Sequence, residues 1–520
     1  MIRFFLRILF FLLCAQGISA DPIHSDSEFD RAIAKANNLF LDADFDAGIA
    51  LTQQLEKTYP NSPAVSYFLA NGYWWKIFRA YIYEKDAKNT PHDKLFEHHL
   101  NQTIEQSEQM LRRNKSDITA LFYLGNAYSL RSRVKGLRGS YFSAGRDAAK
   151  GKNHLERVLQ LQPKQYDTFY NIGVYNYLAG TLPGYAKVLK TLLFLPGGSK
   201  EKGLNYLKIA SKNSTYFGAE AELILARFYG DFEDQPLEAL SIVKKFHDQY
   251  KQNAWYHYWL GTLYSDDIND YETAERVYLE VLQRCGSGIP SYTKEVENQA
   301  RLKLARVHSR QLHPEKAIEE IKALIAEKPK EPSWILARAH MELASIYDQI
   351  GMRKEAIHAY TQVLSLRNYR SYHEDAKKLR SEKYNQTLAD IYRLNLEGRR
   401  LTAQNKFAEA ETSFQTVLKR YPNSEQTLFY LAEMYYRKGD HSTAEKMYTD
   451  LLQRNPREPK WLVGGIYVKL GQIYEAKKQT VAAKRSYESA LQTKFTASDD
   501  RNAAKRGLRQ IASGTSPSTR

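Results

Sequence analysis

The chain has 520 residues, with 75 Lys and Arg against 59 Asp and Glu, which gives a formal net charge of +16. Hydrophobic residues make up 43% of the sequence and the mean hydropathy is −0.57, so a chain disordered throughout and a multi-span membrane protein are both excluded. The length is too great for one compact core and requires several domains or a repeating architecture.

The first twenty residues have the layout of a secretory signal peptide. Arg3 and Arg7 precede or flank a short apolar core, and small residues follow up to Ala20. The core is too short for a stable membrane span, so we predict cleavage after Ala20 and export to the periplasm or the medium, with a retained anchor as the alternative. Cleavage removes Cys14, and Cys285 alone cannot close a disulfide within the chain.

Residues 21–218 predict divergent pairs of amphipathic helices, with a small residue on each helix of a pair. In the third pair Gly125 and Gly151 lie 26 positions apart, and in the fourth pair the separation is 30, whereas it is twelve in the second half of the chain. We therefore predict two insertions, at residues 131–150 and 178–200. Insertions in repeats map to loops on one face, which is often the binding face.

Both insertions combine basic, aromatic and glycine residues. Glycine beside such side chains can form a loop in which backbone N–H groups and cations hold an anion. We predict a patch for an anion or a partner, against the alternative of a solvated basic face. Its residues are Arg131, Lys135, Arg138, Tyr141, Arg146, Tyr185 and Lys187. The apolar stretch at residues 188–195 either fills the groove between units or lies along a lipid surface.

The clearest repeat lies in the second half of the chain, at residues 425–456. Ala432 on its first helix and Ala444 on its second are twelve residues apart, and Gly439 lies at the turn between them. Small residues at these two places let paired helices approach closely. This pattern, about 34 residues long, resembles the tetratricopeptide repeat.

The resemblance covers residues 219–367 and 395–497, separated by a linker at residues 368–394 that holds an extra helix around residues 374–392. Residues 498–520 are expected to form a C-terminal cap and a disordered tail. The resemblance implies an all-α fold, a right-handed superhelix (α-solenoid) of about 10–11 helix pairs.

Two asparagines on first helices, Asn71 and Asn126, directly follow a small residue. We expect them to line the groove of the superhelix, because tandem helical repeats form a concave groove that takes extended peptides or helices. Asparagine at this place can grip a peptide backbone, and capping or exposure is the alternative.

Residues 121–229 carry a further motif. It consists of Pro183, Leu192, Pro196, Gly197, Gly198, Lys202 and Gly203, followed by a helix that ends before Phe217. The segment resembles the central region of a tetratricopeptide family of mitochondrial outer-membrane or lipid-droplet-associated proteins, and equally that of exported bacterial proteins of unassigned role. The resemblance implies a membrane-associated adaptor rather than an enzyme.

The sequence contains no GxSxG, HExxH or GxxxxGK[ST] motif, and we predict no catalytic residue, metal site or cofactor. Export argues against nucleic acid as a partner despite the positive charge. We therefore expect a non-catalytic scaffold that binds protein partners in the cell envelope. Anionic lipid or polysaccharide and peripheral membrane association are further candidates, without a transmembrane span after cleavage. The alternative is an enzyme, or a regulatory subunit of an envelope polysaccharide or lipid enzyme, with its chemistry in the insertions.

Overall fold

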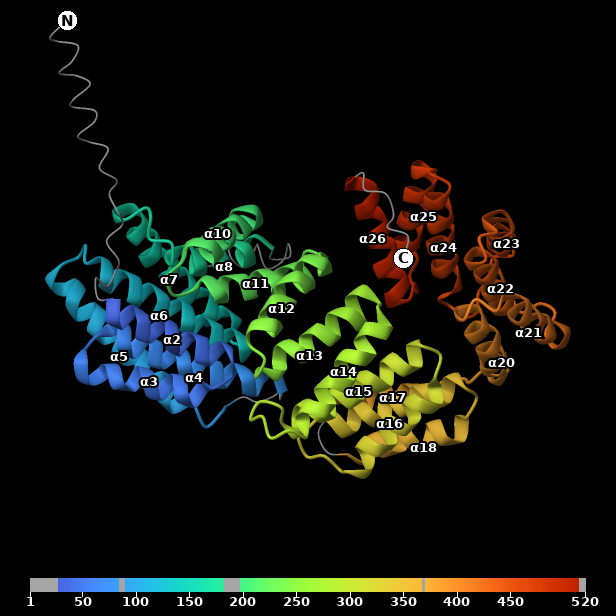
Figure 1. Cartoon of the computed structure of the whole chain (residues 1–520), viewed down its shortest axis with the longest axis horizontal. Coiled ribbons are helices and arrows are strands. Elements are labelled where there is room, and N and C mark those ends of the chain that lie inside the picture. The colour runs from blue at the N-terminus through green and yellow to red at the C-terminus, as the bar shows by residue number, and fades with distance from the viewer. Residues whose placement is uncertain (1–26, 84–88, 182–196, 367–369, 514–520) are drawn as a thin grey trace, which may run out of the picture. The chain divides into compact units, whose positions relative to one another are not determined.

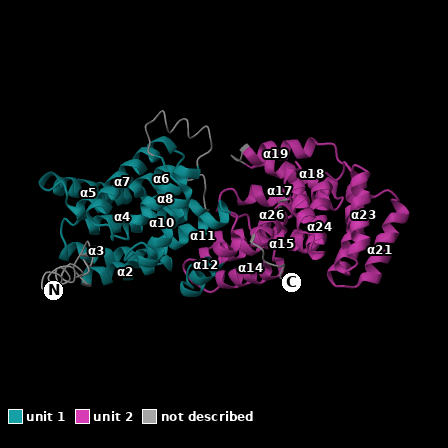
Figure 2. Cartoon of the chain, turned by 90° about the horizontal axis from the view of Figure 1, so that it is seen from above, with its two compact units in different colours: residues 1–233, 241–253 teal, residues 234–240, 254–520 magenta. Residues whose placement is uncertain are grey.

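The computed structural model describes residues 27–83, 89–181, 197–366 and 370–513, and within these ranges the chain forms helices and turns without a strand (Figure 1). The predicted all-α fold is confirmed. The chain divides into two compact units (Figure 2): unit 1 comprises residues 1–233 and 241–253, and unit 2 comprises residues 234–240 and 254–520. The predicted signal peptide, Tyr185, Lys187 and the stretch at residues 188–195 lie outside the described residues.

Unit 1 contains the first ten described helices, the last of which it shares with unit 2. They are α2 (Ser27–Leu41), α3 (Phe45–Thr58), α4 (Pro63–Tyr83), α5 (Asp93–Arg113), α6 (Ile118–Leu137), α7 (Tyr141–Leu161), α8 (Thr168–Thr181), α10 (Lys200–Asn213), α11 (Gly218–Asp231) and α12 (Pro236–Gln249).

Unit 2 contains the remaining helices. They are α13 (Ala254–Thr262) with its continuation, the π-helix η1 (Leu263–Ile268), α14 (Tyr271–Cys285), α15 (Lys294–Arg310), α16 (Pro314–Ala326), α17 (Ile335–Gln349), α18 (Arg353–Ser365), α19 (Arg370–Ser381), α20 (Gln386–Ala403), α21 (Phe407–Arg420), α22 (Glu425–Arg437), α23 (His441–Gln453), α24 (Leu462–Ala476), α25 (Thr480–Gln492) and α26 (Ser498–Ser513). Over the described ranges of both units the element order gives eleven successive pairs, with α19 and α26 outside them, in line with the predicted number.

The two helices of a pair meet at a small residue. A Cβ added to Gly398 on α20 would lie 2.6 Å from the Phe414 ring of α21, and one added to Gly261 on α13 would lie 2.7 Å from the Tyr278 ring of α14. Ala432 is fully buried in the same way in the clearest repeat. Large side chains on the second helix therefore fill the space that the small residue leaves, which is the packing expected from the twelve-residue spacing.

Left-handed backbone and N-cap side chains set the turns within the pairs. Gly439 has a φ of +90°. In other pairs the residue in the turn between the two helices, such as Asn269 or Asn405, also has a positive φ. Asp440 then accepts a hydrogen bond from the Thr443 N–H at 3.0 Å and caps α23. The turn predicted at Gly439 is therefore present.

The structure corrects the expectation of a loop at residues 131–150. The extra residues instead lengthen both helices of the third pair, because α6 continues to Leu137 and α7 begins at Tyr141. Gly139, with a φ of +76°, makes the tight turn between them. Gly136 in α6 and Gly145 in α7 each lower the stability of their helix by about 1 kcal/mol relative to alanine. The tertiary contacts of the long hairpin override this cost.

The extra helix predicted around residues 374–392 differs from the observed arrangement. Helix α19 ends at Ser381, and α20 starts at Gln386 because Asn385 accepts a hydrogen bond from the Leu388 N–H at 3.2 Å and caps the new helix. The C-terminal segment contains α26 up to Ser513, and residues 514–520 lie outside the described residues. None of the described helices has the length and apolar character needed to cross a membrane.

Substituting two glycines of unit 1 separates close packing from simple helix propensity. A Cβ at Gly203 would lie 2.7 Å from the Tyr177 Cα, whereas one at Gly136 would meet no atom within 4 Å. We expect Gly203→Ala to destabilise the protein by about 1–3 kcal/mol. Gly136→Ala is expected to stabilise it by roughly 0.5–1 kcal/mol. Urea unfolding followed by circular dichroism measures both, and equal effects would contradict the packing argument.

Candidate functional site

The described basic residues of the predicted anion patch lie on the α6–α7 hairpin. Acidic side chains already pair with three of them. Arg131 donates to both carboxylate oxygens of Asp147, at 2.8 and 3.0 Å, and the Lys135 ammonium lies 2.6 Å from the same carboxylate. Arg138 pairs with Asp93 at 2.6 Å. Burial opposes the ionisation of Asp147, but its hydrogen bonds with Arg131 and Lys135 hold its pKa below the usual value.

The exposed part of this hairpin is aromatic rather than an anion-holding loop. The side chain of Tyr141 is 76% exposed and that of Phe142 is 49% exposed, and the guanidinium of Arg146 lies 4.8 Å from the centre of the Phe142 ring. The structure thus replaces the predicted Gly-rich loop by a helical hairpin, in which Asp147 of α7 pairs with Arg131 and Lys135 of α6.

The two predicted groove asparagines are buried within unit 1. Asn71 on α4 is 3% exposed, and Asn126 on α6 is fully buried and accepts a hydrogen bond from Asn171 on α8 at 2.6 Å. Arg133 on α6 donates to the side-chain amide oxygen of Asn171 and lies over the ring of Tyr170. Asn126 therefore joins α6 to α8 through a buried polar network, and neither Asn71 nor Asn126 is exposed for a peptide backbone.

Glu220, at the start of α11, belongs to the same buried region. Its side chain is 6% exposed, and burial raises its pKa to about 7, although Arg133 and Asn71 favour the charged form. Asp167, just before α8, is also buried and accepts hydrogen bonds from the N–H groups of Tyr216 and Phe217 at 2.7 and 3.0 Å. Burial raises the pKa of Asp167 to about 6.

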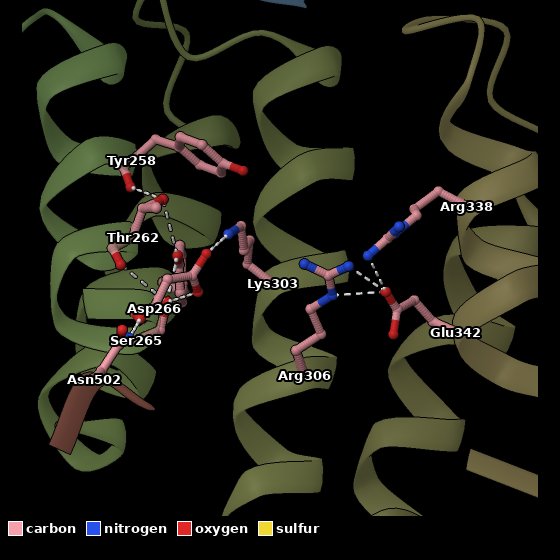
Figure 3. A network of polar contacts seen from close by, with 10 residues as sticks. Tyr258, Thr262, Ser265, Asp266, Lys303, Arg306, Arg338, Glu342 and Asn502 are labelled. Atoms are coloured by element: carbon pink, nitrogen blue, oxygen red, sulfur yellow. Dashed lines mark hydrogen bonds and ion pairs between the residues drawn. The ribbon is translucent and has the colours of Figure 1, made fainter. Parts of the chain in front are cut away.

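Unit 2 contains a row of charged side chains that the sequence reasoning missed (Figure 3). We call Asp266, Lys303, Arg306, Arg338 and Glu342 the charged row. They lie on η1, α15 and α17, the first helices of three successive pairs. Lys303 donates to Asp266, and Ser265 donates to the other oxygen of that carboxylate at 2.7 Å.

A single carboxylate at one end of the charged row holds two guanidinium groups. The Nε of Arg306 donates to Glu342 Oε1 at 2.8 Å, and Nη2 of Arg338 lies 2.7 Å from the same oxygen (Figure 3). The side chains of Arg306 and Arg338 are 32% and 36% exposed, whereas that of Glu342 is 19% exposed. The row has three cations and two acids, so one positive charge has no matching acid within it.

The sequence does contain a signal for these contacts, since the partners lie one repeat apart. Lys303 follows Asp266 by 37 positions, and Glu342 follows Arg306 by 36. Glu433 on α22 and Lys469 on α24 repeat this spacing, with a contact of 2.7 Å and a separation of 36. Burial opposes the ionisation of Glu433, but Lys469 lowers its pKa to about 2. Opposite charges at the repeat period on first helices therefore mark neighbouring side chains.

Two other groups offer little chemistry. Burial raises the pKa of the Cys285 thiol to about 12, so this thiol is protonated at neutral pH and a weak nucleophile. Across the described residues there is no group of three or more His, Cys, Asp or Glu side chains placed to hold a metal ion.

Three segments of unit 2 match models of the tetratricopeptide repeat, at residues 337–369, 395–459 and 464–495. Unit 2 therefore contains tetratricopeptide repeats. These matches lie in the parts of the sequence for which the repeat was predicted, and repeats of this kind are typically non-catalytic scaffolds that bind proteins.

Residues 32–250, less than half of the chain, match the family model described as Regulator of microtubule dynamics protein 1-3. This family differs from the mitochondrial outer-membrane and lipid-droplet family expected from the motif within residues 121–229. Glycines at helix contacts and turns occur in helical repeats of many families, so that motif was not specific enough to choose between them.

The relatives are distant and only partly covered. Regulator of microtubule dynamics protein 1 from Pongo abelii is 23% identical over 145 residues, which is 28% of this chain and 45% of that protein. The Homo sapiens protein of the same name is 26% identical over 95 residues, or 18% of this chain and 30% of that protein. The chain thus spans less than half the length of these relatives. The crystal structure of yeast Tom70 is 14% identical, with a TM-score of 0.32 and coverage of 88% of each chain.

Glu220 gives unit 1 a pH-dependent stability. Its carboxyl holds a proton more tightly in the folded chain, where the pKa is about 7, than at its ordinary value of 4.5, so stability falls as the pH rises between these values. We expect Glu220→Gln to stabilise the protein at pH 8 by on the order of 2–3 kcal/mol, and this gain to vanish toward pH 4. Urea unfolding at both pH values measures the difference. Glu222→Gln on the same helix is the control, and a gain at pH 8 for both variants would contradict the assignment to Glu220.

Proposed function

We propose that this chain is a non-catalytic scaffold of the cell envelope that binds an acidic segment of a protein partner on the charged row of unit 2. The tetratricopeptide repeats support a role in protein–protein interaction, because stacked helix pairs present long surfaces for extended or helical segments. The composition of residues 1–20 supports export through a cleavable signal, to the periplasm or the medium.

The observation that carries the proposed binding site is the sharing of Glu342 by Arg306 and Arg338. One carboxylate cannot offer bidentate hydrogen bonds to two guanidinium groups at once, and both arginines are bound through the same oxygen. Both side chains are partly exposed, so a carboxylate from a partner can reach their free N–H groups. Arginine suits this role because its planar fork matches a carboxylate.

The basic hairpin of unit 1 is a weaker candidate for the same role. Arg131 and Lys135 are held by Asp147, and Arg138 is held by Asp93, so an acidic partner would have to compete with built-in carboxylates. An anionic lipid or polysaccharide would meet the same competition. The charged row is favoured because Arg306 and Arg338 both bind a single oxygen of Glu342, whereas Arg131 binds both oxygens of Asp147.

Binding of an acidic peptide tests the proposed site. A fluorescein-labelled oligoglutamate peptide is titrated with the full chain, and fluorescence anisotropy gives its Kd. Removing both guanidinium groups with Arg306→Ala and Arg338→Ala should weaken binding about tenfold, at the scale of two partly exposed ion pairs. Glu342→Gln removes the competing carboxylate and should tighten binding several-fold.

The matched control for this titration is Lys484→Ala on α25, because this lysine is an exposed cation of the same unit with a side chain that is 59% exposed. It should leave the affinity within twofold of the unmodified chain. An unmodified chain that does not bind the peptide, or equal losses for Lys484→Ala and the arginine variants, would contradict the proposed site.

The N-terminus of the mature chain tests export. When the full sequence is expressed in a bacterium with an outer membrane, we expect the protein in the periplasmic fraction or the medium, with Asp21 as its first residue by mass spectrometry. An Ala20→Arg substitution should block cleavage, because signal peptidase sites need a small residue there. Cytoplasmic protein that retains residues 1–20 would contradict the proposed location.

A further inference from the structure

The C-terminal helix α26 has one apolar and one polar face, which contact different repeats of unit 2. On the apolar face Ala504 is fully buried and packs with Val468 of α24 and Tyr487 of α25. A Cβ added to Gly507 would lie 2.5 Å from the Tyr487 ring, so this face approaches the last helix pair closely. Helix α26 therefore packs closely on the last helix pair, α24 and α25.

The polar face of α26 contacts the first repeat of the same unit. Its residues at helical spacings of three and four positions are Asp499, Asn502, Arg506 and Arg509. Asn502 donates to the Asp266 carbonyl oxygen at 3.0 Å, and Arg506 donates to the Asp267 carbonyl oxygen at 3.0 Å. We call the contacts of α26 with Asp234, residues 266–271 and Arg310 the polar seam.

Charged side chains make the other contacts of the polar seam. Asp499 accepts a hydrogen bond from the Tyr271 hydroxyl at 3.0 Å and lies 2.9 Å from Nη1 of Arg310. At the other end of α26, Arg509 lies 2.9 Å and Lys505 lies 3.5 Å from the carboxylate of Asp234. These side chains are between 30% and 50% exposed, so water and salt reach the ion pairs.

The backbone of η1 explains why its carbonyl groups are available to α26. A π-helix widens the turn, and this one ends at Asn269, which has a left-handed φ of +63°. The Asp266 and Asp267 carbonyl groups at this widened end accept side-chain donors of α26. π-Helical turns are rare and frequently occur at functional sites. Here the π-helix exposes carbonyl groups that accept hydrogen bonds from the polar face of α26.

The two faces of α26 differ in how easily they separate. Exposed ion pairs contribute about 0–1 kcal/mol each and weaken with salt, whereas each buried apolar side chain contributes about 1.5–3 kcal/mol. The polar seam should therefore open while α26 stays packed on α24 and α25. The two ends of unit 2 would then separate without loss of any repeat.

We propose that α26 is a reversible strap that links the last repeat of unit 2 to the first and controls access to the charged row. Asn502 of α26 donates to the backbone carbonyl of Asp266, and the side chain of Asp266 pairs with Lys303 (Figure 3). The strap therefore contacts one end of the charged row. Opening the seam frees this end of the row for a partner. The control of binding rests on the proposed function, but the opening of the seam does not.

Reversing charges on the polar face tests the strap in the full chain. Lys505→Glu with Arg509→Glu places two acids beside Asp234 and should open the seam. Hydrogen–deuterium exchange at residues 263–271 should then become at least tenfold faster, while exchange in α24 and α25 stays unchanged. Adding 0.5 M salt to the unmodified chain should speed exchange at the same residues.

A charge swap separates seam opening from misfolding. Adding Asp234→Arg to the double variant restores opposite charges, and exchange at residues 263–271 should return to within about twofold of the original rate. The matched control is Lys484→Glu with Arg485→Glu on the exposed face of α25, which should leave that exchange unchanged. Unchanged exchange in the double variant, or faster exchange throughout α24 and α25, would overturn the strap.

Peptide binding then distinguishes the two proposals. If the strap controls the charged row, the open variant binds the oligoglutamate peptide several-fold more tightly than the unmodified chain. Faster exchange with unchanged affinity would overturn control of binding but leave the seam intact. Absence of peptide binding in every variant, together with faster exchange, would overturn the proposed function and not the opening of the seam.

Discussion

The close approach of two helices at a small residue is the contact on which the rest of this structure depends. Where Gly398 or Gly261 lies on the first helix, the ring of Phe414 or Tyr278 on the second helix occupies the place of a side chain. The distance between the helices of a pair is therefore fixed by one large and one small residue. The N-cap of the second helix and the left-handed turn before it fix the angle at which the chain returns.

A fixed distance within each pair makes the contacts between pairs periodic. Side chains one repeat apart on first helices come to lie side by side, and three pairs of opposite charges in unit 2 have this separation. The resulting ion pairs differ in burial. Glu433 and Lys469 pair one to one, with side chains 22% and 18% exposed, while Arg306 and Arg338 share one carboxylate and are 32% and 36% exposed. The same geometry thus produces a one-to-one contact at one place and the proposed binding surface at another.

The sequence allowed the periodic features to be predicted because they depend on neighbours at a fixed separation. The burial of Ala432 and Ala444 and the turn at Gly439 follow from one pattern repeated along the chain. The hairpin at residues 131–150 does not follow that pattern. Its glycines favoured a loop. The ion pair of Arg138, however, is formed with Asp93 of another helix pair, and local composition cannot predict that contact.

Burial was equally out of reach at single positions. Asn71 and Asn126 lie beside a small residue on a first helix, where a rotation by one position decides between the groove and the core. Both are buried, and Asn126 finds its partner inside unit 1 in Asn171, which in turn accepts from Arg133. Pattern alone gives the helix and its apolar stripe, whereas the partner of a buried amide comes from a different helix.

The comparison of the two basic regions shows why net charge is a poor guide to binding. The hairpin of unit 1 is the richer in cations, but Arg131 binds both oxygens of Asp147, which Lys135 also contacts. The charged row of unit 2 has fewer cations, and there Arg306 and Arg338 both bind a single oxygen of Glu342. An electrostatic site attracts an acidic partner through the charge that its own structure leaves uncompensated, since pairs that are already formed must first be broken. The overall charge of +16 therefore describes the chain as a whole, whereas the proposed binding site rests on the local geometry around Glu342.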